Sequence, residues 1–95
     1  MNMKKQNPLQ PIVSLLESIS PLARLEVLLI IDAGEACVCH LEARLGYRQS
    51  YISQHLMALR QTGLIDSRRE GKYVFYRLAR PEVLDLLQKA AQISN

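Results

Sequence analysis

The stretch from Arg48 to Gly63 constrains the fold most, because it has the pattern of a helix with two chemically different faces. Ile52, Leu56 and Leu59 recur at helical spacing and form an apolar stripe on one side. The N-terminal half of the other side carries hydrogen-bonding side chains without a fixed charge, namely Gln49, Ser50, Tyr51, Ser53, Gln54 and His55. Such groups suit base edges, so the stretch is either a DNA recognition helix or an ordinary amphipathic helix with a solvated polar face.

A second, shorter helix is expected directly before this one. It runs from about Val38 to Leu45 and ends at Gly46, because glycine readily adopts the left-handed backbone conformation that often follows a helix. Residues 47–49 then form the turn into the longer helix. Two helices joined by a turn of about three or four residues are typical of a helix-turn-helix.

The periodicity changes after Gly63, where two expected strands follow. The first covers residues 64–70 and the second Tyr73 to Leu78, with a tight turn at Gly71 and Lys72 between them. In the second strand alternate side chains can face the core while the others face solvent or DNA. A hairpin after a helix-turn-helix is a wing, and the basic side chains at or beside its tip are Arg68, Arg69 and Lys72. With Arg48, they complete the candidate DNA-binding residues.

Three further helices complete the predicted fold, which is mainly α with a β-hairpin wing, in the order of four helices, the hairpin and a fifth helix. The first is expected from Pro8 to Ile19, and the last from Arg80 to Ile93, started by Pro81. The second is expected to begin at an N-cap hydroxyl followed by proline and to end at Gly34, so its limits are Ser20 and about Asp32. Residues 1–7 are expected to form a flexible N-terminal arm, and residues 8–93 a single winged helix-turn-helix domain.

Positive charge is concentrated in the C-terminal half of this domain. The chain of 95 residues has a formal net charge of +3, yet residues 48–80 alone hold seven basic and two acidic side chains, a balance of +5. A polyanion such as DNA would be attracted to this region, although a solvated basic surface would have the same composition. With 48% hydrophobic residues the chain is too apolar to be a disordered tail.

The sequence also indicates where the protein resides. No apolar run is long enough to span a bilayer, and no signal-peptide core follows Lys4 and Lys5, so we expect a cytoplasmic protein without a membrane partner. The two cysteines, Cys37 and Cys39, are separated by one residue and form no long-range disulfide framework.

The first and last helices have more apolar side chains than one side of a short surface helix needs. Packing them against their copies in a second subunit would bury this surface. A two-fold axis would also place two recognition helices about 34 Å apart, one turn of DNA. We therefore expect a homodimer through these helices; the alternative is a monomer in which the two helices cover each other.

Over about residues 12–90 the chain resembles the ArsR/SmtB family of winged-helix repressors. The resemblance lies in LARLEVLLII, the cysteine segment and SYISQHLMALRQTGLIDSRREGKYVFYRL. Arg48 and Tyr51 depart from the family pattern, since small hydroxyl residues are usual there. The resemblance implies a homodimer that binds an inverted-repeat operator on double-stranded DNA and leaves it when an inducer binds.

The segment Cys37-Val38-Cys39-His40 is the candidate inducer site. It places Cys37 at the N-cap of the short helix, Cys39 in its first turn and His40 where a capping box has Glu. Thiols at a helix N-terminus have a lowered pKa, and the thiolate is the form that binds metal. In a regular helix Cys37 and Cys39 would point about 200° apart, so both reach one ion only if the first turn is distorted.

A Cys-Val-Cys at this position is similar to the metal sites of the arsenite, cadmium and lead sensors in the ArsR/SmtB family. Those sites take further thiolates from the same helix or the N-terminal arm, and this arm offers only Met1, Met3 and the amino terminus. We therefore expect a low-coordinate site for a soft metal or metalloid ion (arsenite, Cd, Pb or Zn) at Cys37, Cys39 and His40. The alternatives are a thiol redox switch and a cysteine pair without a metal response.

Two other classes of protein compete with a DNA-binding regulator. An enzyme is not expected, because His40 and the cysteines lack a third orienting group and no glycine loop cradles phosphate; no organic cofactor is predicted either. A winged-helix protein-interaction module is the stronger rival. It has no need to combine a basic wing with an uncharged polar helix start, which favours the DNA-binding hypothesis.

Overall fold

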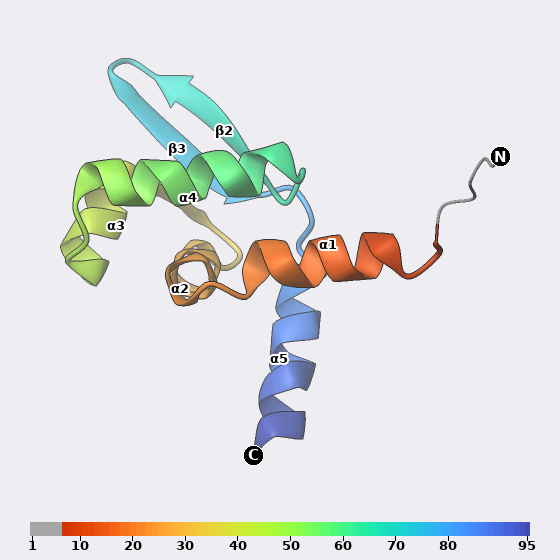
Figure 1. The fold of residues 1–95 in the computed structure, drawn as a ribbon. Coiled ribbons are helices and arrows are strands. Elements are labelled where there is room, and N and C mark those ends of the chain that lie inside the picture. Colours follow the sequence, from red (N-terminus) through yellow and green to blue (C-terminus); the bar gives the residue numbers. More distant parts are fainter. Residues whose placement is uncertain (1–6) are drawn as a thin grey trace, which may run out of the picture.

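The computed structural model describes residues 7–95. The predicted arm and its possible ligands Met1 and Met3 therefore lie outside the described residues, apart from Asn7. The described part contains helices α1 to α5 and strands β1 to β3, arranged as in Figure 1: α1 (Gln10–Ile19), α2 (Leu22–Ile31), β1 (Glu35–Cys37), α3 (Val38–Leu45), α4 (Gln49–Gln61), β2 (Ile65–Glu70), β3 (Tyr73–Leu78) and α5 (Val83–Ser94). The predicted fold class, five helices with a β-hairpin wing, is confirmed.

The start of α2 differs from the prediction. Pro21, with a ψ of 134°, is the N-cap, and no side chain caps the helix. Ser20 had been expected there, but its backbone continues α1 in a right-handed helical conformation and its hydroxyl donates to the Glu17 carbonyl. The N-cap prediction was therefore wrong, because the hydroxyl belongs to the C-terminal end of the preceding helix.

The helix-turn-helix has the predicted limits, with its second helix beginning one residue later than Arg48. Gly46 is left-handed at the end of α3, as expected. At the end of α4, Gly63 has a φ of 80°. Its N–H donates to the Arg60 carbonyl, and the Leu64 N–H donates to the Leu59 carbonyl. This pair of hydrogen bonds is a Schellman motif, which fixes the direction in which the chain leaves α4.

The sheet has one more strand than the predicted hairpin. Its order is β1-β3-β2 and both pairings are antiparallel, and the sequence pattern did not predict β1. Cys37 is the register partner of Phe75, so the strand before α3 is bonded directly to the wing. At the wing tip a two-residue turn joins Glu70 to Tyr73, and Gly71 adopts the positive φ of 62° that such turns require at their first position.

The core lies where α2, α3, α4 and the sheet meet. The apolar stripe predicted on α4 is buried, with Ile52, Leu56 and Leu59 at most 1% exposed. It packs with buried side chains from the other elements, among them Val27, Leu28, Ile31, Leu41 and Ile65. Helix α4 is thus held by its apolar face, which leaves its polar face outward.

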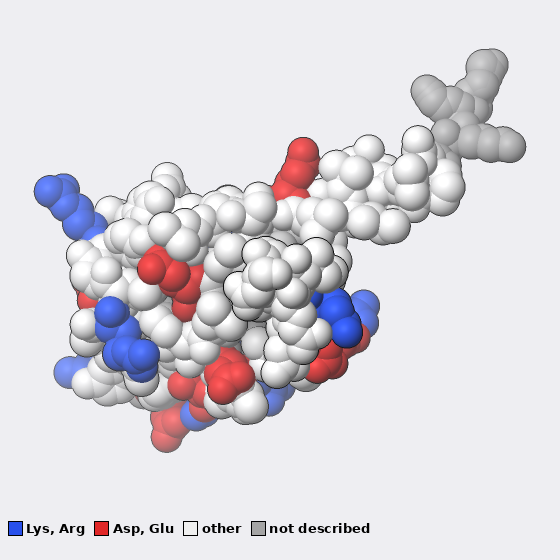
Figure 2. Space-filling model, turned by 90° about the horizontal axis from the view of Figure 1, so that it is seen from below, with Lys and Arg blue, Asp and Glu red and all other residues white. Residues whose placement is uncertain are grey.

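The two terminal helices project from this core. Figure 1 shows α1 extending to one side and α5 leaving the domain in another direction. Helix α1 begins two residues later than predicted, and α5 begins three residues later. Large apolar side chains on both are exposed, namely Leu9, Ile12, Val13, Leu16, Leu86 and Ile93. Figure 2 shows that the projecting α1 carries almost only uncharged residues. No helix within residues 7–95 has the length and apolar character needed to cross a membrane.

Candidate functional site

The N-terminal half of α4 presents most of the predicted base-reading residues to solvent. Arg48, Gln49, Ser50 and Gln54 are exposed, and Ser53 is half-buried. These side chains make no hydrogen bond to another described residue, so their donors and acceptors are available to a ligand. The structure therefore brings five of the predicted residues onto one polar surface.

Tyr51 lies beside this surface and is held by aromatic neighbours. Its ring meets Tyr47 edge-on at a centroid distance of 5.0 Å and His55 at 4.6 Å. The Tyr47 hydroxyl donates to Glu26 at 2.6 Å, and that hydrogen bond raises the pKa of Tyr47. The contacts tie the start of α4 to α2, which limits how far the polar surface can turn relative to the core.

His55 faces inward, in contrast to the predicted exposed position. Its Nδ1 accepts a hydrogen bond from Arg24 Nε at 3.0 Å, while the Arg24 guanidinium also donates to the Ser18 carbonyl. The neutral ring must then carry its proton on Nε2, which is buried and has no hydrogen-bond partner among residues 7–95. Burial, with the nearby Arg24 charge, lowers the pKa of His55. The residue joins α4 to α2, and its ring is not presented with Gln49 and Gln54.

The three basic residues predicted for the wing have different surroundings. Arg69 and Lys72 are exposed and form no ion pair with another residue of the described chain. Arg68 donates through Nε and Nη2 to both carboxylate oxygens of Glu35 at 2.8 and 2.7 Å, and through Nη1 to Glu70 at 2.8 Å. Its charge is thus already neutralised, and it links β2 to β1.

The same contact affects the carboxylate. The hydrogen bond from Arg68 holds the pKa of Glu35 below its usual value. Glu35 is therefore charged whenever the pair is formed, and the pair fixes strand β2 of the wing to β1, the strand that leads to Cys37.

Helix α4 and the wing meet in a hollow that the sequence did not indicate. It has a volume of about 350 Å³ and is lined by Ser53, Met57, Arg60, Gln61 and Tyr76. Arg60 lies two turns after Ser53 on the same face of α4, a spacing from which it could have been added to the candidates. The hollow adds one cation and one amide to the polar surface on the C-terminal half of the helix.

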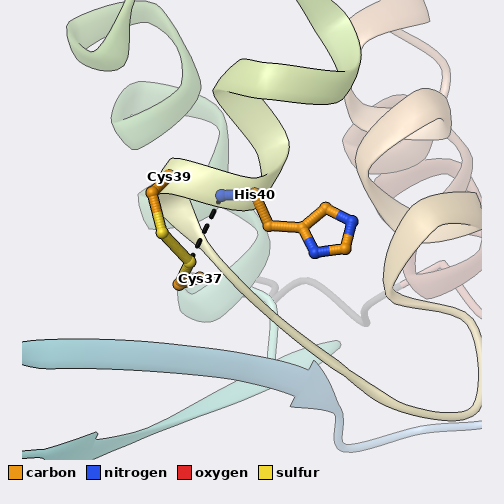
Figure 3. Close-up of a disulfide and its surroundings, with 3 residues drawn as sticks. All are labelled: Cys37, Cys39 and His40. Atoms are coloured by element: carbon orange, nitrogen blue, oxygen red, sulfur yellow. Dashed lines mark hydrogen bonds between the residues drawn. A yellow bond between two sulfur atoms is a disulfide. The ribbon is translucent and has the colours of Figure 1, made fainter.

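The cysteine pair occupies the predicted position at the start of α3. Cys37 is the N-cap, and its sulfur accepts a hydrogen bond from the His40 backbone N–H at 3.2 Å. The two sulfurs are joined in a disulfide, with the Cα atoms 5.3 Å apart. In Figure 3 the His40 imidazole points away from the disulfide, so the structure brings Cys37 and Cys39 together but not the third predicted ligand.

A soft metal ion does not fit this arrangement of donors. Sulfurs in a disulfide offer no thiolate, and the His40 ring lies on the other side of the helix start. Within residues 7–95, no three His, Cys, Asp or Glu side chains are grouped closely enough to hold a metal ion. The predicted three-ligand site at Cys37, Cys39 and His40 is thus absent from this conformation.

The amino-acid sequence is similar to those of known bacterial regulatory proteins. Residues 23–67 match the family described as "Bacterial regulatory protein, arsR family". The chain is 42% identical over 74 residues to a biofilm growth-associated repressor of Agrobacterium fabrum, covering 78% of this chain and 63% of the relative. It is 49% identical over 53 residues to an arsenical resistance operon repressor of Escherichia coli, covering 56% of this chain and 45% of the relative.

A third relative matches in both sequence and structure. The transcriptional activator HlyU of Vibrio cholerae is 38% identical over 76 residues, covering 80% of this chain and 70% of the relative. The solved structure of HlyU has a TM-score of 0.80 at 32% identity, covering 90% of this chain and 97% of that one. The chain spans less than two thirds of the length of the first two relatives.

Proposed function

The chain belongs to the ArsR family of bacterial regulatory proteins, and from this premise we propose that it is a transcriptional repressor that binds an inverted-repeat DNA operator as a homodimer. The observation that carries the proposal is the polar surface of α4, exposed beside Arg69 and Lys72 of the wing, neither of which forms an ion pair within residues 7–95. Two of these relatives are named as repressors and one as an activator, and the two repressors favour repression here.

The two parts of the surface have different roles in this proposal. Gln49, Ser50, Ser53 and Gln54 enter the major groove and read base edges, since amides and hydroxyls both donate and accept hydrogen bonds. The charged side chains contact phosphates, which positions the protein without reading sequence; they are Arg48, Arg60, Arg69 and Lys72. Arg68 and His55 act indirectly, by fixing the wing and α4 to the rest of the domain.

The dimer is proposed to form through α1 and α5. Ile12, Val13 and Leu16 of α1 and its N-cap residue Leu9 lie on one helical face and are 42–60% exposed. A second copy would remove these side chains from water together with those of α5, and at about 25 cal/mol per Å² this burial would stabilise a small chain substantially. A two-fold axis would present two copies of α4 to successive major grooves.

The disulfide favours a thiol redox switch as the signal that controls DNA binding. Cys37 is the last residue of β1, which pairs with the wing strand β3, and it also caps α3. Because α3 and α4 form the helix-turn-helix, opening the disulfide changes a junction between both DNA-contacting elements. The coupling needed for regulation is about 1–3 kcal/mol, which a change in helix capping can supply.

A soft-ion inducer, predicted from the sequence, requires more structural changes around the two cysteines than the redox switch does. The relative from Escherichia coli is named for arsenical resistance, which supports such an inducer. In this chain the disulfide must first be reduced, and a further donor must come from elsewhere. Both inducers act on the same two sulfurs, so one experiment separates them.

That experiment is a fluorescence-anisotropy titration of DNA from upstream of the chain's own gene. The oxidised protein, the reduced protein, and the reduced protein with arsenite, Cd(II), Pb(II) or Zn(II) are compared, with a scrambled duplex as control. The proposal predicts tighter binding to the upstream duplex and a difference between oxidised and reduced protein. If only the ions change affinity, the redox switch is wrong; if no state prefers the upstream duplex, the repressor assignment is wrong.

A further inference from the structure

A hollow of about 300 Å³ lies against the disulfide, where the start of α3, the start of α4 and the wing tip meet. Both cysteines contribute to its wall, together with Gln49 from α4 and Tyr73 from β3. Two opposite charges also line it, Lys72 from the wing tip and Glu42 from α3. It therefore combines a reactive sulfur pair with a cation and an anion.

The two charges are available to a ligand. Neither Glu42 nor Lys72 forms a salt bridge with a described residue, although each lies on the wall of the same hollow. The Lys72 ammonium lies 5.7 Å from the centre of the Tyr73 ring, a cation–π contact that holds it near the hollow. A small molecule with one carboxylate and one ammonium group would complement this wall.

The two sulfurs are not equivalent toward an attacking thiol. Cys39 is exposed, whereas Cys37 is half-buried and its sulfur accepts the His40 N–H at the helix N-terminus. That hydrogen bond and the helix dipole stabilise a thiolate on Cys37, which makes it the better leaving group. Attack is therefore directed to the Cys39 sulfur, with Cys37 released.

We propose that this hollow is a thiol-exchange site at which a small zwitterionic thiol, of the amino-acid type, opens the Cys37–Cys39 disulfide and remains bound to Cys39. The proposal deepens the redox switch and so rests on the proposed function. The ligand's carboxylate pairs with Lys72 and its ammonium with Glu42, while its sulfur reaches Cys39.

The reaction balances without any additional oxidant. The thiol loses its proton to solvent, and its sulfur forms a bond to Cys39 Sγ as the bond between Cys39 Sγ and Cys37 Sγ breaks. The electron pair of the broken bond goes to Cys37, which becomes a thiolate and takes a proton according to pH. The incoming thiol is oxidised to one half of a mixed disulfide, and Cys37 is reduced.

The bound ligand interferes with DNA at two points. It occupies space beside Gln49, proposed to read a base edge, and neutralises Lys72, proposed to contact a phosphate. Loss of one phosphate contact in each subunit lowers the slope of log K against log salt by about 1.8 per dimer, at about 0.9 for each contact. The adduct therefore weakens DNA binding and reduces its salt dependence.

The test exposes the oxidised full chain to four thiols that differ in charge. They are cysteine, 3-mercaptopropionate, cysteamine and 2-mercaptoethanol, which carry both charged groups, the carboxylate alone, the ammonium alone, and neither. Exchange is stopped with N-ethylmaleimide, and intact mass with peptide mapping locates the adduct and the label. Each rate is expressed as the ratio of variant to wild type, which cancels the reactivity of the thiol itself.

The expected pattern distinguishes the two charges. Lys72→Gln slows cysteine and 3-mercaptopropionate by about two- to fivefold, in keeping with exposed charge pairs, and leaves the other two thiols unchanged. Glu42→Gln slows cysteine and cysteamine instead. Lys89→Gln, the same charge change on α5, alters none of the four ratios. The mixed disulfide is found on Cys39 and the maleimide label on Cys37.

Three results would overturn the proposal: no one-to-one adduct at any time point, an adduct on Cys37 with the label on Cys39, or a Lys72→Gln effect equal for all four thiols. The adduct is detected by mass, so the result does not depend on DNA. If the wild-type protein fails to bind duplex DNA, the proposed function fails while the exchange site stands. If DNA binding holds and no adduct forms, only the exchange site fails.

Discussion

Replacing the wing cations one at a time should separate residues that contact phosphate from the one that fixes the wing. Arg69→Gln and Lys72→Gln each remove an exposed charge without an ion-pair partner in the described chain. Each phosphate contact contributes about 0.9 to the slope of log K against log salt, so each substitution should lower the slope by about 1.8 per dimer. This decrease in slope should be equal for specific and scrambled duplexes, because phosphates carry no sequence information.

Arg68→Gln is the matched comparison, since it removes the same charge from the same strand as Arg69→Gln. Arg68 is already paired with Glu35 and Glu70, so few counterions are displaced when DNA approaches it. The slope should change by less than half as much, while the free energy of unfolding should fall because Glu35 loses its partner. Anisotropy titrations at four salt concentrations measure the slopes. Equal slopes for all three variants would refute the distinction drawn from the ion pairs.

Three further predictions concern the dimer, the buried histidine and the end of α4. Leu86→Asp should halve the mass in solution at micromolar concentration, measured by light scattering, because the exposed apolar face of α5 is the proposed interface. The free energy of unfolding should fall as pH drops below about 6.5, because the unfolded chain then protonates His55 before the folded chain does. His55→Gln should reduce that fall in urea titrations at about pH 7.5 and 5.5. Gly63→Ala should lower the free energy of unfolding by about 1–2 kcal/mol, because alanine is strained at a φ of 80°.

Each of these predictions has a control in the same chain. Met57→Asp, on an exposed apolar residue of α4, should leave the dimer intact, and a monomeric wild type would contradict the interface. His40→Gln, at an exposed histidine, should keep the acid-dependent fall that His55→Gln reduces; equal behaviour of the two would contradict the role of burial. Gly34→Ala meets only the Ile31 carbonyl at 3.8 Å and should cost little, so a loss as large as at Gly63 would argue against the left-handed strain.

The periodic parts of the chain were predictable because their signals are local. The stripe of Ile52, Leu56 and Leu59, with Gly63 at its end, indicates the recognition helix from within a single segment. The turn at Gly71 likewise indicates the hairpin. Strand β1 is three residues long, too short to show alternation, and it exists because its backbone pairs with β3.

The surroundings of the site residues could not be predicted, because they depend on partners far away in sequence. Arg68 is basic and near a turn, which suggests a phosphate contact, yet its partner Glu35 precedes it by 33 positions. His55 lies among polar residues, yet Arg24, 31 positions earlier, holds its ring inward. The position of Cys37 and Cys39 at the start of α3 was predictable from the following helix pattern, whereas the hollow that joins them to the wing depends on the sheet.

Selecting duplexes from a random pool with the wild-type protein and with Gln54→Ala shows whether α4 reads DNA sequence and whether the protein binds as a dimer. We expect the wild-type protein to enrich an inverted repeat whose half-sites lie about 10 base pairs apart, centre to centre. We expect Gln54→Ala to lose preference at one position of each half-site, by about 1–3 kcal/mol, and to keep the rest of the motif. Selection that enriches no motif, or a motif identical for both proteins at every position, would contradict the reading of DNA sequence by α4.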